Sequence, residues 1–217
     1  MKIENLTVSY GENVVLNGIN LDVLDGEITC VLGSSGVGKT SLLKAVSKLI
    51  KYDGFIEDKS VSFVFQSPAL IDGITLFQNL KLVCNDEEKI EKGLIDFSLL
   101  DKKDCYPKTL SGGEKQRVNL LRAFLSSGEV TLLDEPFSSL DIKTKILLIN
   151  YFISAWQKDK KATLFVTHDI DEALAVAGRI IILKDGVVAL DMKIDSDYPR
   201  EYFGDSDKRK LLLSHLI

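Results

Sequence analysis

The apolar residues of the chain follow a strand period in some segments and a helix period in others. In residues 2–10, Ile3, Leu6 and Val8 are separated by polar neighbours, which is typical of a half-buried strand. After residue 75 the spacing becomes helical, with Leu76 and Leu80 one turn apart. Both kinds of element are therefore expected, and we predict the α/β class. Further strands are predicted at 14–23, 28–32, 55–57, 61–65, 130–136 (ended by Pro136), 162–167, 179–184 and 187–191. Helices are predicted after residue 40 (with Leu49 on its apolar face), at 75–99 (with Val83 and Ile95), from 111 to Gly128, at 142–157, and in the tail from Tyr198 to Ile217 (with Leu211, Leu212 and Leu216).

A glycine-rich turn separates the apolar strand 28–32 from the helix that follows it. Glycines let the backbone adopt left-handed conformations and approach a ligand closely, and the free N–H groups at the helix start then form a cradle for phosphate. Lys39 can reach the β- and γ-phosphates, and the Thr40 hydroxyl can bind Mg²⁺. The alternative, an ordinary Gly/Ser turn, is disfavoured because a strand precedes the loop and a helix follows it. The predicted phosphate-binding residues are Gly33, Ser34, Ser35, Gly36, Val37, Gly38, Lys39, Thr40 and Ser41.

Composition and charge limit the class of protein. With 217 residues, of which 45% are hydrophobic, the chain is long enough for one domain with a sizeable core. The net charge of −5 argues against a general nucleic-acid-binding surface. No apolar run approaches the roughly 20 residues that span a bilayer, and residues 1–5 lack a signal-peptide pattern, so we expect a cytoplasmic location. The 3 cysteines are too scattered for a disulfide framework or a metal cluster.

A second helix start, at residues 110–114, carries two adjacent glycines. Ser111 and Glu114 have the spacing of a capping box. Gly112 and Gly113 each cost a helix about 1 kcal/mol relative to alanine. One interpretation is a plain capped helix; the other is that a phosphate approaches the exposed N–H groups, and the cost of the glycines favours the second.

Other polar or aromatic residues stand where predicted strands end. Asp134 and Glu135 follow a buried apolar run, where one carboxylate can bind Mg²⁺ and the other can orient water. His168 ends a later strand and is expected at the same edge of the sheet, although a lone histidine is more often an ordinary surface or core residue. Gln66 is expected near Mg²⁺ if its strand lies beside the strand of the phosphate loop; otherwise it is a solvated strand end. Tyr10 either fills a strand edge or stacks on a flat base such as adenine.

Residues 67–128 are expected to form a small helical subdomain within a single domain of residues 1–217. The segment 75–99 contains no strand signal. The lead-in, Ala69 to Ile74, is more apolar than an exposed loop favours. It is therefore either tucked into the fold or docked on a partner.

Taken in order, these motifs resemble those of an ATP-binding-cassette (ABC) ATPase over nearly the whole chain. GSSGVGKT (33–40) matches the Walker A loop, LSGGE (110–114) the family signature and VTLLDEP (130–136) the Walker B strand. Gln66 matches the Q-loop, SSLD (138–141) the D-loop, His168 the switch histidine and Tyr10 the aromatic that stacks on adenine. The chain departs from the family pattern at three places: Glu114 stands in place of the more usual Gln, Thr131 lies within the Walker B strand, and the strands between Gly54 and Phe63 are short. No catalytic group is lost.

The resemblance implies a fold and a mechanism. The fold is a P-loop NTPase (ABC ATPase) core with an antiparallel β subdomain and a small helical subdomain. Two cassettes, expected to form a homodimer, face each other head to tail with two ATP molecules between them. Glu135 polarises the attacking water, while His168 contacts the γ-phosphate and helps to stabilise the transition state. The resemblance further implies Gln66 as a catalytic residue, Thr40, Gln66 and Asp134 as Mg²⁺ contacts, and Tyr10, Ser111, Gly112, Gly113 and Asp141 as ATP contacts.

The phrases FVFQSPALIDGITLFQNL, DEPFSSLD and VTHDIDEAL resemble the nitrate, sulfonate, taurine and thiamine-precursor branch of importers. This implies an ATPase subunit on the inner face of the cell membrane, separate permease chains and an extracytoplasmic substrate-binding protein. The segment 67–80 lies where such subunits receive the permease. An exporter cassette with a separate permease is the alternative. A soluble, non-transport ABC ATPase is disfavoured because the chain has neither a second cassette nor a basic surface, and LSGGE argues against a P-loop kinase.

Overall fold

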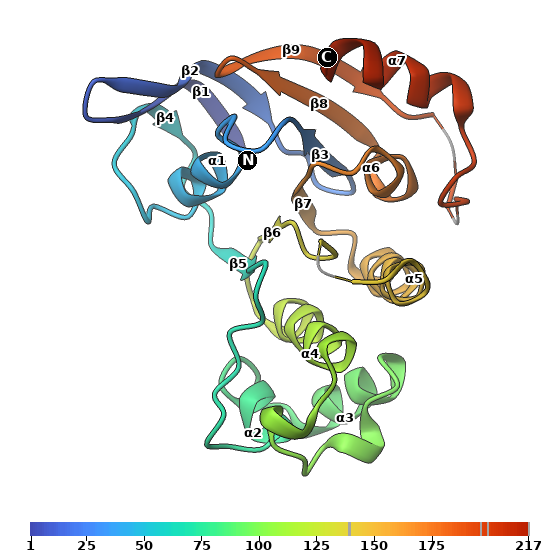
Figure 1. The fold of residues 1–217 in the computed structure, drawn as a ribbon. Helices are drawn as coiled ribbons and strands as arrows, with labels where there is room; N and C mark the ends of the chain where they lie inside the picture. The colour runs from blue at the N-terminus through green and yellow to red at the C-terminus, as the bar shows by residue number, and fades with distance from the viewer. Residues whose placement is uncertain (139, 196, 199, 217) are drawn as a thin grey trace.

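Two β-sheets form the frame of the protein, which we describe from a computed structural model covering all residues except Ser139, Ser196, Pro199 and Ile217 (Figure 1). The larger sheet has six strands, and its first five run parallel while the last is antiparallel. Their order in space is β5 (Val61–Val64), β6 (Val130–Asp134), β7 (Ala162–Thr167), β3 (Ile28–Leu32), β8 (Arg179–Lys184) and β9 (Val187–Lys193).

The central strands of this sheet are buried on both faces. Every residue of β3, β6 and β7 is buried, as expected for parallel strands covered by helices on both sides. In the pairing of β3 with β7, Leu32 lies opposite Thr167, and in the pairing of β6 with β7, Asp134 lies opposite Val166. The carboxyl ends of the three strands therefore meet at one edge, where α/β sheets place their ligands.

The smaller sheet is antiparallel, in the order β2 (Asn13–Asp22), β1 (Lys2–Tyr10) and β4 (Asp53–Ile56). Helix α1 (Lys39–Val46) lies between the two sheets, since its Leu42 and Leu43 belong to one hydrophobic core with Leu6 of β1 and Leu132 of β6. This arrangement confirms the predicted α/β core with an antiparallel β subdomain.

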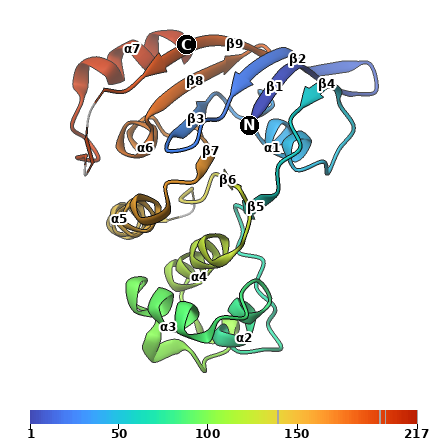
Figure 2. The same cartoon turned by 180° about the vertical axis from the view of Figure 1, so that it is seen from behind.

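Between β5 and β6 the chain leaves the sheet and forms a helical region. It contains α2 (Leu76–Lys81), α3 (Glu87–Asp96) and α4 (Gly112–Leu125), with two 3₁₀ turns, Leu100–Lys102 and Pro107–Thr109. Figures 1 and 2 place these helices at the end of the molecule opposite the antiparallel sheet. Leu76, Leu94 and Leu121 pack into the second hydrophobic core. This core also contains Phe165 of β7, on the face of the large sheet opposite α1. The boundaries predicted for a helical subdomain, 67–128, remain a prediction.

The remaining helices are α5 (Ile142–Asp159), α6 (Ile170–Val176) and α7 (Ser206–Leu216). Their apolar residues, among them Phe152, Ala173 and Leu212, join the same second core. The large sheet thus has α1 on one face and α5 and α6 on the other. Among the described residues, no helix combines the length and the hydrophobicity needed to cross a membrane.

Several predicted helix faces and ends are wrong. Leu49 lies beyond the end of α1 and is 61% exposed, Ile95 is 60% exposed on α3, and Val83 follows the end of α2. Within α7, Leu212 is buried and Leu211 is exposed, while Leu216 is partly buried. Ile50, rather than Leu49, packs against the core around α1, and Ile90 and Leu94, rather than Ile95, lie in the second core. Strand β6 ends at Asp134, before its predicted end at Pro136. Two helix ends differ from the prediction, because α4 ends at Leu125 before Gly128 and α5 extends to Asp159. Two strand ends also differ, because β4 begins at Asp53 and β9 extends to Lys193. Pro199 and Ile217 of the predicted tail lie outside the described residues.

Candidate active site

The glycine-rich loop carries the chain from β3 into α1. Gly38, the residue before the helix, has a φ of 111°, and Gly36 has a φ of 83°, both in the left-handed region that favours glycine. A Cβ on Gly38 would also come within 2.7 Å of the Leu16 side chain. The first N–H groups of α1 have no partner within the helix, as in an anion site at a helix N-terminus.

Lys39 is folded back over this loop. Its Nζ donates hydrogen bonds to the carbonyl oxygens of Gly33, at 2.8 Å, and Ser34, at 3.0 Å. Its side chain is only 5% exposed, and the Glu135 Oε1 atom lies 3.6 Å from Nζ. Burial lowers the pKa of Lys39, and the carboxylates of Glu135 and Asp134 oppose that shift. The loop therefore holds a partly desolvated cation beside an anion cradle.

Thr40 and Asp134 bring two oxygen ligands together at the carboxyl edge of the sheet. The Thr40 hydroxyl donates to Asp134 Oδ1 at 3.1 Å. Burial raises the pKa of Asp134, and the hydrogen bond from Thr40 acts in the opposite direction. A carboxylate and a hydroxyl beside a phosphate cradle fit Mg²⁺, which takes few protein ligands and completes its shell with water and phosphate. Among the residues that the structure describes, no closed cluster of three or more His, Cys, Asp or Glu side chains is present.

Glu135 stands between two positively charged or ionisable groups. Its Oε2 lies 3.0 Å from His168 Nδ1, and its other carboxylate oxygen faces Lys39. Its backbone has a φ of 42°, which is uncommon for a residue with a side chain, and its N–H donates to Val166 O at 3.0 Å. Such strained residues concentrate at functional sites, so the geometry supports a catalytic role for this carboxylate.

The position expected for Gln66 depends on where its strand lies in the sheet. Its strand, β5, pairs with β6 at the edge of the sheet, and two strands separate it from β3. Gln66 Nε2 instead donates to Ser138 Oγ at 3.1 Å, just after Glu135 in the chain. The condition under which Gln66 would lie near Mg²⁺, a strand next to the phosphate-loop strand, is not met, and its role as a metal contact stays a prediction.

The adjacent glycines Gly112 and Gly113 are the first two residues of α4, and the expected capping box is present at this helix start. Ser111 Oγ accepts from the Glu114 N–H at 3.2 Å, and Glu114 Oε2 accepts from the Ser111 N–H at 2.7 Å. No hydrogen bond or ion pair between described residues joins this helix start to the phosphate loop. Asp141 caps α5 by accepting from the N–H and hydroxyl of Thr144. Ser139, which belongs to the predicted D-loop, lies outside the described residues.

Tyr10 reaches the start of α1 from the antiparallel sheet. Its ring is 51% exposed, and its hydroxyl lies 3.3 Å from Ser41 Oγ. The exposed ring beside the phosphate loop is in a position to stack on a flat base. The strand-edge alternative is disfavoured because half of the side chain remains in solvent.

A family model described as ABC transporter matches residues 16–138, more than half of the chain. The chain belongs to the ABC transporter family. Two aliphatic sulfonates import ATP-binding proteins, from Mycobacterium sp. (strain MCS) and Pseudomonas syringae pv. syringae (strain B728a), are each 36% identical to it. These alignments cover 99% and 100% of this chain and 92% and 80% of the two relatives, respectively.

Solved structures agree with this assignment. A metal-chelate type ABC transporter in an inward-facing conformation matches with a TM-score of 0.78 and 25% identity, over 88% of this chain and 82% of that chain. A dimeric ATP-binding cassette in a post-hydrolysis state, bound to ADP and Pi, matches with a TM-score of 0.76 and 29% identity, over 90% and 99% of the two chains. The chain is thus an ABC ATPase that binds ATP. The comparisons favour the importer branch over the exporter alternative.

Two residues that support the site were missed in the sequence. Gln116 and Asn119 of α4 are buried, although they are polar. Gln116 Nε2 donates to Pro136 O at 2.5 Å, and Asn119 Nδ2 donates to Phe65 O at 3.0 Å. They tie the signature helix of this ABC cassette to the residues just after Glu135 and just before Gln66. In the sequence they were visible only as two amides among the apolar residues of a predicted helix.

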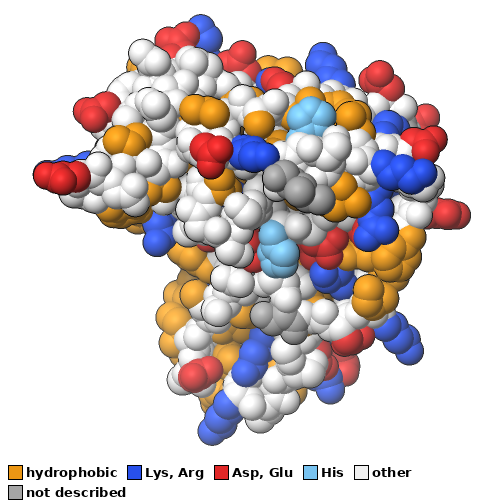
Figure 3. Space-filling view, turned by 45° about the horizontal axis from the view of Figure 1, so that its top comes forward, with side chains coloured by type: hydrophobic (Ala, Val, Ile, Leu, Met, Phe, Trp, Pro, Cys, Tyr) orange, Lys and Arg blue, Asp and Glu red, His pale blue; other side chains and the backbone are white. Residues whose placement is uncertain are grey.

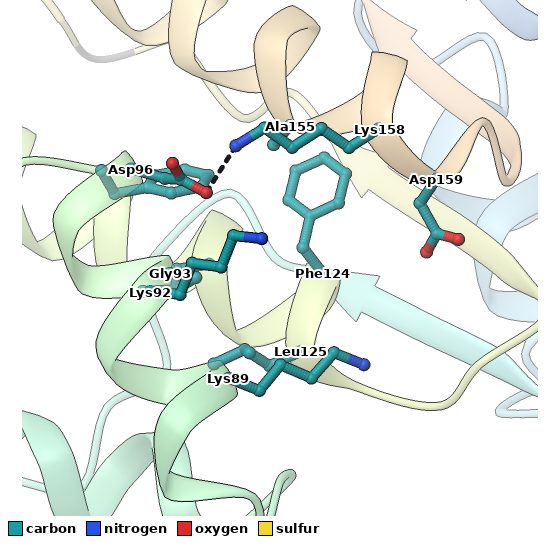
Figure 4. A pocket seen from close by; sticks show the side chains of 11 residues that line it. Lys89, Lys92, Gly93, Asp96, Phe124, Leu125, Ala155, Lys158 and Asp159 are labelled. Atoms are coloured by element: carbon teal, nitrogen blue, oxygen red, sulfur yellow. Dashed lines mark hydrogen bonds and ion pairs between the residues drawn. The ribbon is translucent and has the colours of Figure 1, made fainter.

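A groove of about 300 Å³ lies elsewhere, between α3, α4 and α5 (Figure 4). Its apolar walls include Phe97 and Phe124, and an ion pair of 2.5 Å between Lys158 and Asp96 crosses its rim. None of the predicted nucleotide or metal contacts lines it. This groove marks the joint between the helical region and α5 rather than the nucleotide site.

Proposed function

We propose that the chain is the ATP-hydrolysing subunit of an ABC importer and that it acts as a head-to-tail dimer. The observation that carries the proposal is the cluster of Lys39, Glu135 and His168 at the carboxyl edge of the sheet, next to the glycine-rich loop. A lysine that binds phosphate and a carboxylate that positions water are recurring groups in phosphoryl transfer, and the imidazole stands beside them.

In this proposal each group of the cluster has one task. Lys39 leaves the loop carbonyls and binds the β- and γ-phosphates. Glu135 orients the attacking water and accepts its proton, while His168 contacts the γ-phosphate. Thr40 and Asp134 would hold Mg²⁺, which neutralises charge on the phosphates when bound. Gln66 remains the third proposed metal contact and would have to leave Ser138 to reach that position.

A second cassette completes the proposed site. The capping box fixes the start of α4 and engages the Ser111 N–H, so that Gly112 and Gly113 present their N–H groups beside the Ser111 hydroxyl without blocking side chains. A Cβ on Gly112 would meet nothing within 4 Å, which is consistent with open space in front of this glycine. We infer that these groups bind the γ-phosphate of an ATP held by the partner cassette, with Asp141 next to the shared interface. The dimeric relative bound to ADP and Pi supports this arrangement.

The loop before α2 is the proposed contact with the permease. Buried Asn79 fixes this loop, because its Oδ1 accepts from Ile71 N at 2.8 Å and its Nδ2 donates to Ile71 O at 3.1 Å. The Ile71 side chain nevertheless remains 50% exposed. Figure 3 shows hydrophobic side chains gathered on the flanks of the lower part of the molecule. A backbone held rigidly with its apolar side chain in water is consistent with a docking surface.

If this loop binds a permease, the chain is located on the inner face of the cell membrane. An extracytoplasmic substrate-binding protein would complete the transporter. Ile71→Asp should abolish co-sedimentation of the chain with vesicles that contain its permease, because burial of an unpaired carboxylate is costly. Phe55→Asp is the matched control, since Phe55 is 52% exposed on the antiparallel sheet. Equal binding by the two variants would refute the assignment of this loop.

A further inference from the structure

The C-terminal segment, here residues 197–198 and 200–216, is attached to the helix that follows His168. At the start of α6, the Tyr202 hydroxyl donates to Asp169 Oδ2 at 2.8 Å, and Arg209 forms an ion pair of 3.2 Å with Asp171. Tyr202 is 9% exposed, and Leu212 of α7 is fully buried in the adjacent core. The segment is therefore packed onto α6 rather than lying free on the surface.

The same segment also binds the other end of α6. The Tyr198 hydroxyl donates to Val176 O, and the Arg200 guanidinium donates to Ala177 O. Val176 is the last residue of the helix and Ala177 is its C-cap, and carbonyls at a helix C-terminus lack partners within the helix. Tyr198 also packs edge-on against Trp156 of α5, with ring centroids 5.7 Å apart. Two tyrosine hydroxyls thus hold opposite ends of one short helix.

Asp169 connects the first of these attachments to the active site. It directly follows His168, and its Oδ1 caps α6 by accepting from the N–H groups of Asp171 and Glu172. Its Oδ2 receives Tyr202 and also Lys145 Nζ, at 2.8 Å. Its own N–H donates to the Thr167 hydroxyl at 3.0 Å. The backbone is therefore fixed on both sides of the histidine.

The charges around Asp169 make these bonds strong. Burial raises the pKa of Asp169, but the hydrogen bonds from Lys145 and Tyr202 lower it by more, so the carboxylate stays ionised. Lys145 also forms an ion pair of 2.7 Å with Glu172, whose side chain is 1% exposed. A hydrogen bond to an ionised group is worth more than one between neutral groups. Tyr202 therefore makes one of the stronger contacts of the segment.

The His168 side chain depends on this backbone for its placement. It is 53% exposed, and its ring Nδ1 lies 3.0 Å from Glu135 Oε2. We propose that Tyr202 is a positioning residue, through which the C-terminal segment fixes Asp169 and so sets where His168 meets Glu135 and the γ-phosphate. This inference rests on the proposed role of His168 in hydrolysis.

The test compares Tyr202→Phe with Tyr198→Phe. Each substitution removes one hydroxyl of the same segment at one end of α6 and keeps the ring, so the two variants are matched in chemistry. Tyr202→Phe should lower kcat for ATP hydrolysis by about tenfold, the size expected for one lost hydrogen bond to a charged group, with KM for ATP unchanged. Tyr198→Phe should keep the wild-type kcat. Thermal unfolding of both variants checks that they lose similar stability.

A second readout does not depend on turnover. The chain has 2 histidines, so His215→Gln assigns the two imidazole Hε1 signals in an NMR spectrum. Tyr202→Phe should shift the His168 signal, and Tyr198→Phe should leave it in place. Unchanged kcat and an unchanged His168 signal in Tyr202→Phe would overturn the inference, as would an equal loss of kcat in both variants.

A further variant separates this inference from the function on which it rests. His168→Ala should abolish hydrolysis while ATP still binds. If His168→Ala hydrolyses ATP normally, the proposed role of His168 is wrong, and the inference about turnover falls with it. If His168→Ala is inactive and Tyr202→Phe behaves like Tyr198→Phe, the role of His168 stands and only the positioning by Tyr202 is refuted.

Discussion

Glu135 has an uncommon backbone conformation, and its two carboxylate oxygens face two different side chains. Its φ of 42° turns the side chain out of the line of β6. One carboxylate oxygen then faces Lys39 at 3.6 Å and the other faces His168 at 3.0 Å. A left-handed residue with a side chain costs about 1–3 kcal/mol, which the surrounding structure must offset. The cost is understandable if the carboxylate has to stand between a phosphate-binding lysine and the attacking water.

Glu135→Gln should lower the rate of ATP hydrolysis by at least about 100-fold, because an amide cannot accept the proton of the attacking water. ATP affinity should persist, since Lys39 and the glycine-rich loop are unchanged. Phosphate release and nucleotide binding measured on the same preparation check both statements. Normal turnover in this variant would contradict the role given to Glu135.

Lys39→Ala should weaken ATP binding by about tenfold or more, because the charge-assisted bonds to the phosphates are lost. Lys44→Ala is the matched control, since Lys44 lies on the same helix with its side chain exposed. Calorimetric titration with ATP compares the two. Equal affinities would count against the assignment of the phosphate loop.

At the scale of elements, the fold depends on contacts between segments that are far apart in the sequence. Glu129, just before β6, accepts from Lys59 Nζ at 2.9 Å and from Ser60 N at 3.0 Å, just before β5. These bonds join the starts of two neighbouring parallel strands. They lower the pKa of Glu129 from 4.5 to about 2, with Lys59 as the largest cause.

Glu129→Gln should therefore destabilise the protein in a pH-dependent way. The folded-state pKa is depressed, so the ionised carboxylate stabilises the fold at pH values above about 4.5 and loses that effect as the pH falls toward 2. The difference in Tm between wild type and variant should be largest near pH 7 and should shrink below about pH 4.5. A difference that stays constant down to pH 3 would refute this account.

Local motifs were predictable from the sequence, and long-range pairing was not. The glycine loop, the capping box at Ser111 and the buried strands each follow from residues close together in the chain, and the structure contains all of them. Strand order is decided by crossover packing, so the position of β5 beside β6, and with it the contact of Gln66 with Ser138, could not be deduced. The bond from Tyr202 to Asp169 spans 33 residues and has no local signal.

At the scale of the whole molecule, the proposed active-site parts of one chain lie in two separate places. Lys39, Glu135 and His168 meet at the sheet edge, whereas Ser111 begins a helix of the region that Figure 1 shows at the lower end. A dimer in which each signature faces the partner's phosphate loop would unite them. We therefore predict that ATP itself holds the two cassettes together.

Ser111→Arg should prevent this dimer without unfolding the monomer. The residue is exposed and lies at the proposed interface, so a long cation would occupy the space of the partner's nucleotide. The loss of the N-cap costs about 1 kcal/mol, which Tm measurements would register as a small change. A dimer that survives this substitution would show that the signature lies outside the interface.

The most direct test of the account is the molar mass of Glu135→Gln by size-exclusion chromatography with light scattering, with and without ATP in the absence of Mg²⁺. Removal of the proton acceptor and the metal should trap the nucleotide-bound state. We predict a monomer without ATP and a dimer with it. A chain that remains monomeric while calorimetry shows ATP bound would contradict the composite site at the centre of this account.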